Sequence, residues 1–242
     1  MAAQRTAHRE IALDLLKWLA IISMVADHLR FLWPEQVWLF MVGRLAFPWF
    51  CLAIAANVAR SLPGQVYTRA NARYLIGLLV FSLISEPPYR WLNVDSPTLS
   101  VMPTLTLGLL VAWGVHHRRP VMGLLALLAL VVGAGAAKWL MYGVPGVLLP
   151  AAFVLALRLR GVAWLLPGVT AAMANLTDLW LAQHSLHPLA LLALGVAFCS
   201  AGLGLAMLRL GWRQHIWPIG RWGYAFYPLH LALIKALIEL SR

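Results

Sequence analysis

Apolar blocks, each about as long as a membrane crossing, nearly fill this sequence. A helix needs roughly 20 apolar residues to cross a bilayer, and only short polar or Pro/Gly breaks separate the blocks. Of the 242 residues, 62% are hydrophobic and 11% are charged, whereas a soluble domain carries about 25% charged residues. With a mean hydropathy of +0.79, the sequence predicts an all-α, polytopic integral membrane helical bundle that forms a single domain over residues 1–242.

The breaks between the blocks predict about nine transmembrane helices. The expected spans are 11–33, 36–56, 74–92, 98–116, 120–139, 144–158, 162–180, 187–208 and 216–238. The first block contains the ionisable side chains Asp14, Lys17, Asp27 and His28, with Arg30 near its end. Because a signal peptide has a short uncharged core, this block is expected to remain as a spanning helix.

Arginines gather in every second loop of this arrangement. They are Arg5, Arg9, Arg60, Arg69, Arg73, Arg118, Arg119, Arg158, Arg160, Arg209 and Arg213. The alternate loops are close to neutral, and basic loops stay in the cytoplasm. The N-terminus is therefore expected in the cytoplasm and the C-terminus across the membrane. The same bias explains the net charge of +11 better than nucleic-acid binding, which needs basic residues clustered on one face.

The charged residues of the first span are candidates for a site, because an ionisable group inside a membrane costs roughly 2.5–3.5 kcal/mol on insertion scales. Lys17 and His28 share one face of a helix, but three turns separate them by roughly 16 Å, so they cannot touch. Asp14 lies one turn before Lys17, which permits an ion pair. Lys17 is thus either self-neutralised by Asp14 or part of a site, and His28 is the candidate general base.

Arg44 and His230 are two further ionisable residues placed inside apolar runs. Arginine stays charged, so Arg44 needs an acid, carbonyl groups or an anionic ligand, and Asp27 on the preceding helix is the nearest acid by topology. The sequence leaves open a structural Asp27–Arg44 pair and an anion-binding Arg44. His230 is either a buried histidine that is hydrogen-bonded to a neighbour or the partner of His28 in a catalytic pair.

Motifs for metal or serine-hydrolase chemistry are missing from the sequence. It contains no CxxC, HExxH, GxSxG or glycine-rich phosphate loop. His116 and His117 precede Arg118 and Arg119 in a basic cytoplasmic loop, where a solvated or phosphate-facing role is expected. No metal is expected.

Short motifs recur in order along nearly the whole chain. They are Leu13–Lys17, Met24–His28, Gly43–Phe50 followed by Asn57, Met141–Gly146 and Phe226–Leu231. On successive spans, this series resembles the TraX family of conjugative-pilin N-acetyltransferases. A basic residue and a histidine separated by ten residues, as in Lys17 and His28, also resemble the wider membrane acyltransferase-3 superfamily.

The resemblance implies an enzyme of the bacterial inner membrane that transfers acetyl from acetyl-CoA to the N-terminal amine of a conjugative pilin. It implies a pilin as partner, beside membrane lipids and without nucleic acid. In an inner membrane, the orientation expected from the basic loops places the N-terminus in the cytoplasm and the C-terminus in the periplasm. His28 would be the general base, tuned by Asp27 or His230, and the site is expected in a channel between Lys17 and His28. The residues implied to bind CoA or substrate are Lys17, Arg44, Arg73, Asn57, Tyr142 and Tyr227.

Other functions stay open at this stage. Some conjugative pilins are cyclised head to tail, so the same acyl-transfer machinery could serve a cyclase. A non-enzymatic pilin chaperone or scaffold would use its buried charges only for helix pairing, and a transporter should show duplicated halves, which the sequence lacks. Glu86 departs from the motif pattern of the family and is either a substitute acid or a local feature.

Overall fold

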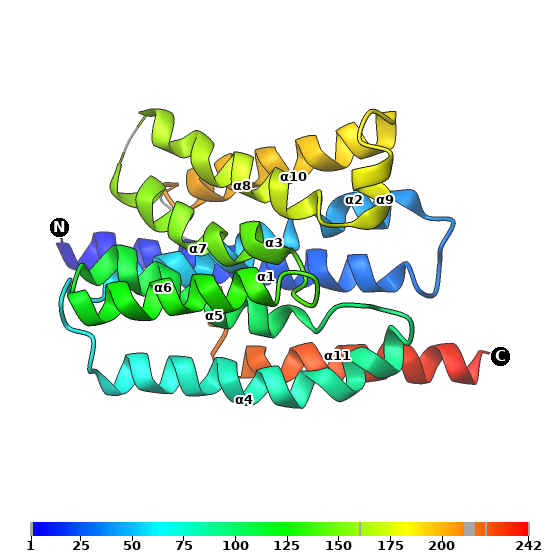
Figure 1. Ribbon diagram of the computed structural model, residues 1–242, viewed down its shortest axis with the longest axis horizontal. Helices are drawn as coiled ribbons and strands as arrows, with labels where there is room; N and C mark the ends of the chain where they lie inside the picture. Colours follow the sequence, from blue (N-terminus) through cyan, green and yellow to red (C-terminus); the bar gives the residue numbers. More distant parts are fainter. Residues whose placement is uncertain (1, 160, 211–215, 221, 242) are drawn as a thin grey trace.

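The computed structural model describes residues 2–159, 161–210, 216–220 and 222–241, with side chains from Ile11 onward, and all secondary structure in these ranges is helical (Figure 1). The helices are α1 Ala2–Leu29, α2 Val37–Gly43, α3 Ala46–Arg60, α4 Arg69–Leu92, α5 Val101–His117, α6 Pro120–Gly135, α7 Gly143–Arg158, the 3-10 helix η1 Gly161–Trp164, α8 Leu165–Asn175, α9 Leu179–Gln183, α10 Pro188–Met207 and α11 Trp222–Leu240. The all-α prediction is therefore confirmed.

Every expected span contains a helix, but length and composition support fewer crossings. Within the described residues, the stretches Val37–Arg60 and Pro188–Met207 are the two that are long and apolar enough to cross a membrane. The helices α5, α6 and α7 are apolar but shorter. These findings support membrane association, whereas nine crossings and the orientation of the termini stay predictions.

The second expected span is broken into α2 and α3 at Arg44 and Leu45. Pro48 explains the position of the break. A proline has no N–H for the carbonyl group four residues earlier, and its ring clashes with that carbonyl, which here belongs to Arg44. Pro48 therefore lies in the first turn of α3, and regular bonding resumes from Trp49 N to Leu45 O at 3.2 Å.

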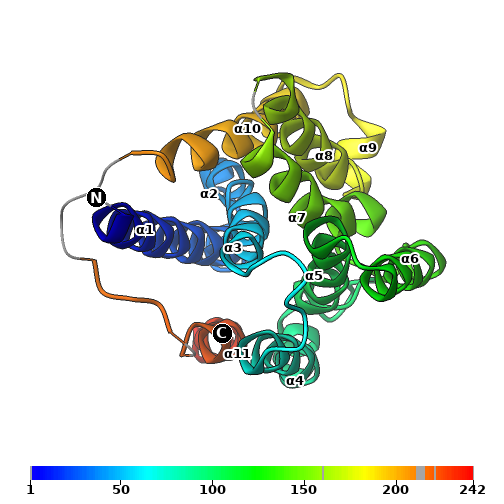
Figure 2. The same cartoon turned by 90° about the vertical axis from the view of Figure 1, so that its left-hand side faces the viewer.

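The helices run roughly along one axis and pack in layers (Figure 2). α1 lies at one edge and packs against α3, α5 packs against α7, and α4 packs against α11 along one side. α8 and α10 cover the opposite side. Close contact between α5 and α7 depends on Gly108, where an added Cβ would lie 2.8 Å from the Pro150 ring. Small residues permit such close approach of helices.

The two ends of the bundle differ in charge. Three segments lie at the same end of the bundle as the N-terminus (Figure 1). They are the α3–α4 loop, the α5–α6 turn and the C-terminal end of α7. Most of the arginines that the sequence analysis assigned to the basic loops lie in or beside these segments. We call this the basic end, and we call the end where α1 and α4 finish the far end. Arg160 and Arg213 lie outside the described residues, as do the side chains of Arg5 and Arg9.

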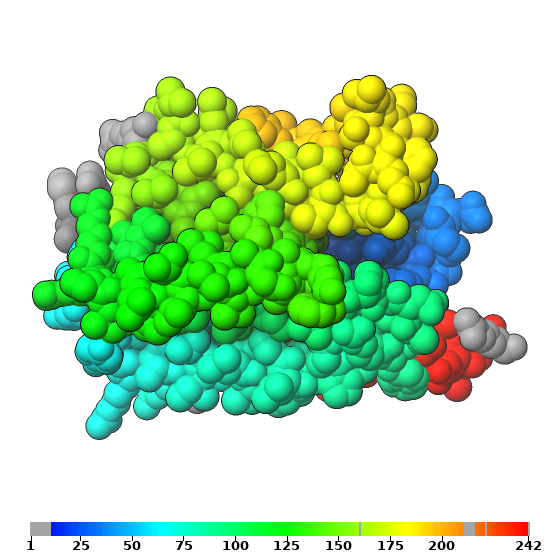
Figure 3. Space-filling model, in the orientation of Figure 1, coloured from blue at the N-terminus to red at the C-terminus, as the bar shows by residue number. Residues whose placement is uncertain are grey.

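A broad apolar surface faces outward on α4 and α6. The large exposed apolar residues of α6 are Val121, Leu124, Leu127, Leu128, Val131 and Val132, and those of α4 are Ile76, Leu79, Val80, Leu83 and Ile84. α6 crosses the face shown in Figure 3 without any element covering it. Soluble monomers rarely expose contiguous apolar patches of more than a few hundred Å². Hydrocarbon is therefore a better solvent than water for this face.

Candidate active site

Two adjoining cavities follow α1 through the bundle. The first, which we call the apolar cavity, has a volume of about 340 Å³ and lies between α1, α3, α4, α5 and the start of α11. Its few polar side chains are Lys17, Asn57, Tyr74, Tyr224 and Tyr227. The second, the polar cavity, has a volume of about 480 Å³ and lies toward the far end. It is lined by charged and hydroxyl groups, among them Asp27, His28, Arg30, Tyr142 and Thr98.

Four residues line both cavities and form the boundary between them. They come from four different helices and are Met24, Phe50, Val101 and Tyr227. We call these four residues the partition. Lys17 lines only the apolar cavity and His28 only the polar one, so the space between Lys17 and His28 is occupied by two cavities in series.

His28 and His230 are directly hydrogen-bonded. Nδ1 of His28 lies 2.8 Å from Nε2 of His230, although 202 positions separate the two residues in the chain. Nδ1 of His230 lies 3.0 Å from the carbonyl oxygen of Phe226, and the Phe226 ring stacks on the His230 ring with centroids 5.2 Å apart. His230 is only 6% exposed. α11 thus holds one histidine rigidly against the other.

These contacts assign the protons of the neutral pair. A carbonyl oxygen only accepts hydrogen bonds, so His230 carries its proton on Nδ1 and donates it to Phe226. Nε2 of His230 is then an acceptor, and His28 donates to it through Nδ1. The remaining nitrogen of His28, Nε2, keeps its lone pair. The pair therefore presents His28 as a base whose tautomer is set by a second histidine.

Asp27 pairs with Arg44 and not with His28. The Arg44 Nη2 to Asp27 Oδ1 distance is 2.9 Å, Nη1 donates to Asn175 Oδ1 at 3.0 Å, and Nε donates to the Phe40 carbonyl at 3.3 Å. Arg44 is 5% exposed. An added Cβ at Gly43 would lie 2.6 Å from the Asp27 carboxyl carbon, so the pair depends on that glycine. Of the two arrangements that the sequence left open for Arg44, the structure contains the pair with Asp27.

Lys17 both pairs and lines a cavity. Its Nζ lies 2.9 Å from Asp14 Oδ1, as the spacing on α1 permits, and its side chain is 20% exposed. Because it also borders the apolar cavity, the two interpretations of Lys17 are compatible with each other. Asp14 supplies the local counter-charge.

The remaining residues implied by the family resemblance are placed differently from one another. Asn57 borders the apolar cavity together with Tyr74. Tyr142 lines the polar cavity and stacks on Phe47 with centroids 3.9 Å apart. Tyr227 belongs to the partition. Arg73 is exposed on α4 and borders neither cavity, because it lies one turn inside the basic end, on the outer side of the helix.

Glu86 is a local structural feature at the far end. Its carboxylate accepts from Arg90 Nε at 2.8 Å and from the backbone N–H of Ser100 at 2.9 Å. Arg90 in turn donates to the Ser96 carbonyl at 2.9 Å. These bonds fasten the loop between α4 and α5, which supplies Ser96 and Thr98 to the wall of the polar cavity.

The expectation for His116 and His117 was wrong, because both side chains are buried at the end of α5. His116 Nε2 donates to the Ser61 carbonyl at 2.9 Å, and His117 Nδ1 accepts from the Gly64 N–H at 3.2 Å. Arg158 donates to the Val115 carbonyl at 2.9 Å and to the His116 carbonyl at 2.6 Å. Cations near a helix C-terminus stabilise its last carbonyl groups, so this cluster caps α5 and holds the α3–α4 loop.

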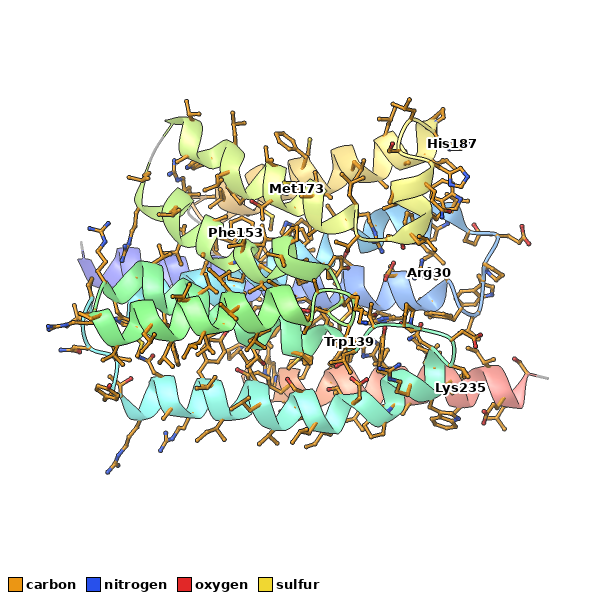
Figure 4. The ribbon with its side chains drawn as sticks, viewed as in Figure 1. Arg30, Trp139, Phe153, Met173, His187 and Lys235 are labelled. Carbon is orange, nitrogen blue, oxygen red and sulfur yellow. The ribbon has the colours of Figure 1, made fainter. Side chains whose placement is uncertain are left out.

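Some residues of the site are absent from the sequence-based expectations. Phe50 and Met24 lie in recognised motifs, but nothing in their local pattern indicated a role in a cavity wall. Val101 begins α5 and lies in no motif. Arg30 and Lys138 line the polar cavity from a helix end and a loop, and Figure 4 places Arg30 and the neighbouring Trp139 in the half of the bundle away from the N-terminus.

Over the described residues, fold and site together define an all-helical protein in which a hydrogen-bonded histidine pair lies at the wall of an internal polar cavity. The chain matches the family described as TraX protein over residues 12–238, and it belongs to that family. It is 28% identical over 242 residues to the probable fimbrial assembly protein FimC, serogroup H1, of Dichelobacter nodosus, covering 90% of this chain and 92% of the relative. It is 44% identical over 48 residues to protein TraX of Escherichia coli K12, covering 19% of each chain. No solved structure matches.

Proposed function

We propose that this protein is a membrane-embedded N-acyltransferase that moves the acetyl group of acetyl-CoA to the N-terminal amine of a pilin. The observation that carries the proposal is the His28–His230 pair, which lies beside the partition where the two cavities meet. Membership of the TraX family and similarity to a protein named for fimbrial assembly support a role in pilus assembly. They also support a pilin as the acceptor.

The apolar cavity suits the arm of the acyl donor. The pantetheine arm of CoA is a flexible chain of methylene and dimethyl groups with two amides. Ligand cavities are mostly apolar, with a few polar groups that fix orientation, and here Lys17, Asn57 and Tyr74 supply such groups. The nucleotide of CoA stays outside the bundle at the basic end, where the exposed Arg73 on α4 is available to its phosphates.

The polar cavity suits the acceptor, because an N-terminal ammonium needs polar surroundings until it loses a proton. An amine attacks a thioester only when neutral. His28 Nε2 removes one proton from the ammonium, and the neutral nitrogen attacks the carbonyl carbon. A C–N bond forms while the C–S bond breaks, the nitrogen transfers a second proton to the leaving thiolate, and His28 returns its own proton to water.

The proposed position in the membrane makes a prediction for α6. Changing Leu128 to lysine places a charge in the middle of a lipid-facing helix, which costs about 2.5–3.5 kcal/mol on insertion scales. After carbonate extraction, we expect a smaller amount of the Leu128→Lys protein than of the wild type to remain in the membrane. Leu128→Ala should behave like the wild type. If lysine and alanine give equal amounts of integrated protein, α6 does not face lipid.

The mass of the cognate pilin tests the function. In cells that make this protein, we expect intact-mass spectra of the pilin to show one added acetyl group, which disappears when the gene is deleted. Loss of one water molecule would instead indicate head-to-tail cyclisation. An unchanged mass, with fewer pili on the deletion strain, would indicate a scaffold and contradict the proposal.

A further inference from the structure

The partition, formed by Met24, Phe50, Val101 and Tyr227, is the wall that the two cavities share. We propose that these four side chains set the length of the transferred acyl group and exclude acyl chains longer than acetyl. This inference rests on the proposed function and adds to it the residues that determine donor specificity.

The partition lies directly beside the histidine pair. The ring centroid of Tyr227 is 6.4 Å from that of His28 and 5.7 Å from that of His230. A thioester that enters along the apolar cavity must place its carbonyl carbon within reach of an amine held at His28. The carbonyl group and the acyl carbons attached to it therefore lie among the partition side chains.

The four side chains are held in place by packing from separate helices. Met24 and Tyr227 are buried, and Phe50 and Val101 are half-buried. Tyr227 and Val101 line the same two cavities, so α11 and the start of α5 both contribute to this wall. A wall built from four helices cannot move aside through the motion of one loop, so space for extra carbons requires a smaller side chain.

Size exclusion of this kind has a characteristic strength. One methylene group in an apolar pocket changes the specificity ratio by roughly 10-fold to 200-fold. Acetyl differs from butyryl by two methylene groups, so the wild type should prefer acetyl-CoA strongly. Removing the Phe50 ring or shortening Met24 should open room for the two additional carbons.

Competition between two donors tests the inference. Purified wild type, Phe50→Ala and Met24→Ala are given an equimolar mixture of acetyl-CoA and butyryl-CoA with an N-terminal pilin peptide, and the two products are counted by mass. We expect the acetyl-to-butyryl ratio to fall at least 10-fold in both variants. Phe198→Ala, a half-buried phenylalanine on α10 that lines neither cavity, is the matched control and should keep the wild-type ratio.

Each outcome of the competition has a distinct meaning. If the wild type makes the acetylated peptide and both variants keep its donor ratio, the partition does not select acyl length and only this inference is overturned. If the wild type transfers neither acyl group, the proposed function is wrong and the inference falls with it. Should Phe50→Ala and Met24→Ala be inactive with both donors, Val101→Ala decides, since it removes only two methyl groups, and an unchanged ratio there overturns the inference.

Discussion

His28→Ala protein is expected to acetylate the pilin N-terminus about 10²-fold to 10⁴-fold more slowly than the wild type, which is the contribution of a positioned general base. The lone pair on His28 Nε2 is the one that the hydrogen-bonded pair leaves available. The rate is measured with purified protein, acetyl-CoA and a pilin peptide. A variant with the full wild-type rate would remove His28 from the chemistry.

His230 provides the matched comparison for the same assay, because it acts through His28 and is a positioning residue. His230→Gln keeps an oxygen that can accept from His28 Nδ1, so we expect it to retain more activity than His230→Leu, which offers no acceptor. The pH at which the rate is half-maximal should shift in His230→Leu. Equal rates and equal pH profiles in the two variants would show that His230 only fills space.

Breaking the Asp27–Arg44 pair is expected to destabilise the protein by about 3–5 kcal/mol. Arg44 alone is a buried charge without its carboxylate, and Asp27 alone keeps only the partly exposed Arg30, whose Nε lies 3.9 Å away. Arg44→Leu also leaves Asn175 without the guanidinium donor that contacts it at 3.0 Å. Unfolding of the detergent-solubilised variants by denaturant gives the stability. Arg44→Lys should also be destabilised, since an ammonium group cannot reproduce three contacts of a planar guanidinium.

The double variant Asp27→Asn/Arg44→Leu separates a structural pair from an anion-binding arginine. With both charges removed, the loss of stability should be smaller than the sum of the single losses, by about 0.5–3 kcal/mol. His28→Ala, in contrast, removes no charge from an ion pair and should lose less stability than Arg44→Leu, while losing far more activity. Additive losses in the double variant would mean that Asp27 and Arg44 do not stabilise each other.

Local sequence patterns were sufficient for much of the fold. Apolar blocks predicted a helix at every expected span, since helix formation depends on neighbours three and four residues away. The Asp14–Lys17 ion pair followed from the same spacing. The break at Arg44 could have been derived from Pro48 through the carbonyl group four residues earlier. The separate helix α9, Leu179–Gln183 with Asp178 as its N-cap, was not expected, because it crosses the predicted end of the seventh span at residue 180.

Contacts with other segments, rather than spacing along the sequence, determine the roles of the residues that the sequence left open or misjudged. His116 and His117 carry the signature of a solvated basic loop, but α7 brings Arg158 beneath them and the α3–α4 loop covers them. Glu86 could have been a substitute acid. In the structure it stabilises the loop between α4 and α5, because the backbone N–H of Ser100 donates a hydrogen bond to its carboxylate. In both cases, hydrogen bonds with another segment of the chain determine the structural role of the residue.

The sequence by itself determined the helical class of the protein, the family motifs, and the separation of Lys17 from His28, because all of these depend on composition and on distances along one helix. Only the tertiary structure decided that His230 faces His28, that Asp27 faces Arg44, and that side chains from four helices divide the interior into two cavities. Those contacts arise from the packing of helices that lie far apart in the chain, and such packing depends on the shapes of whole surfaces rather than on any local pattern.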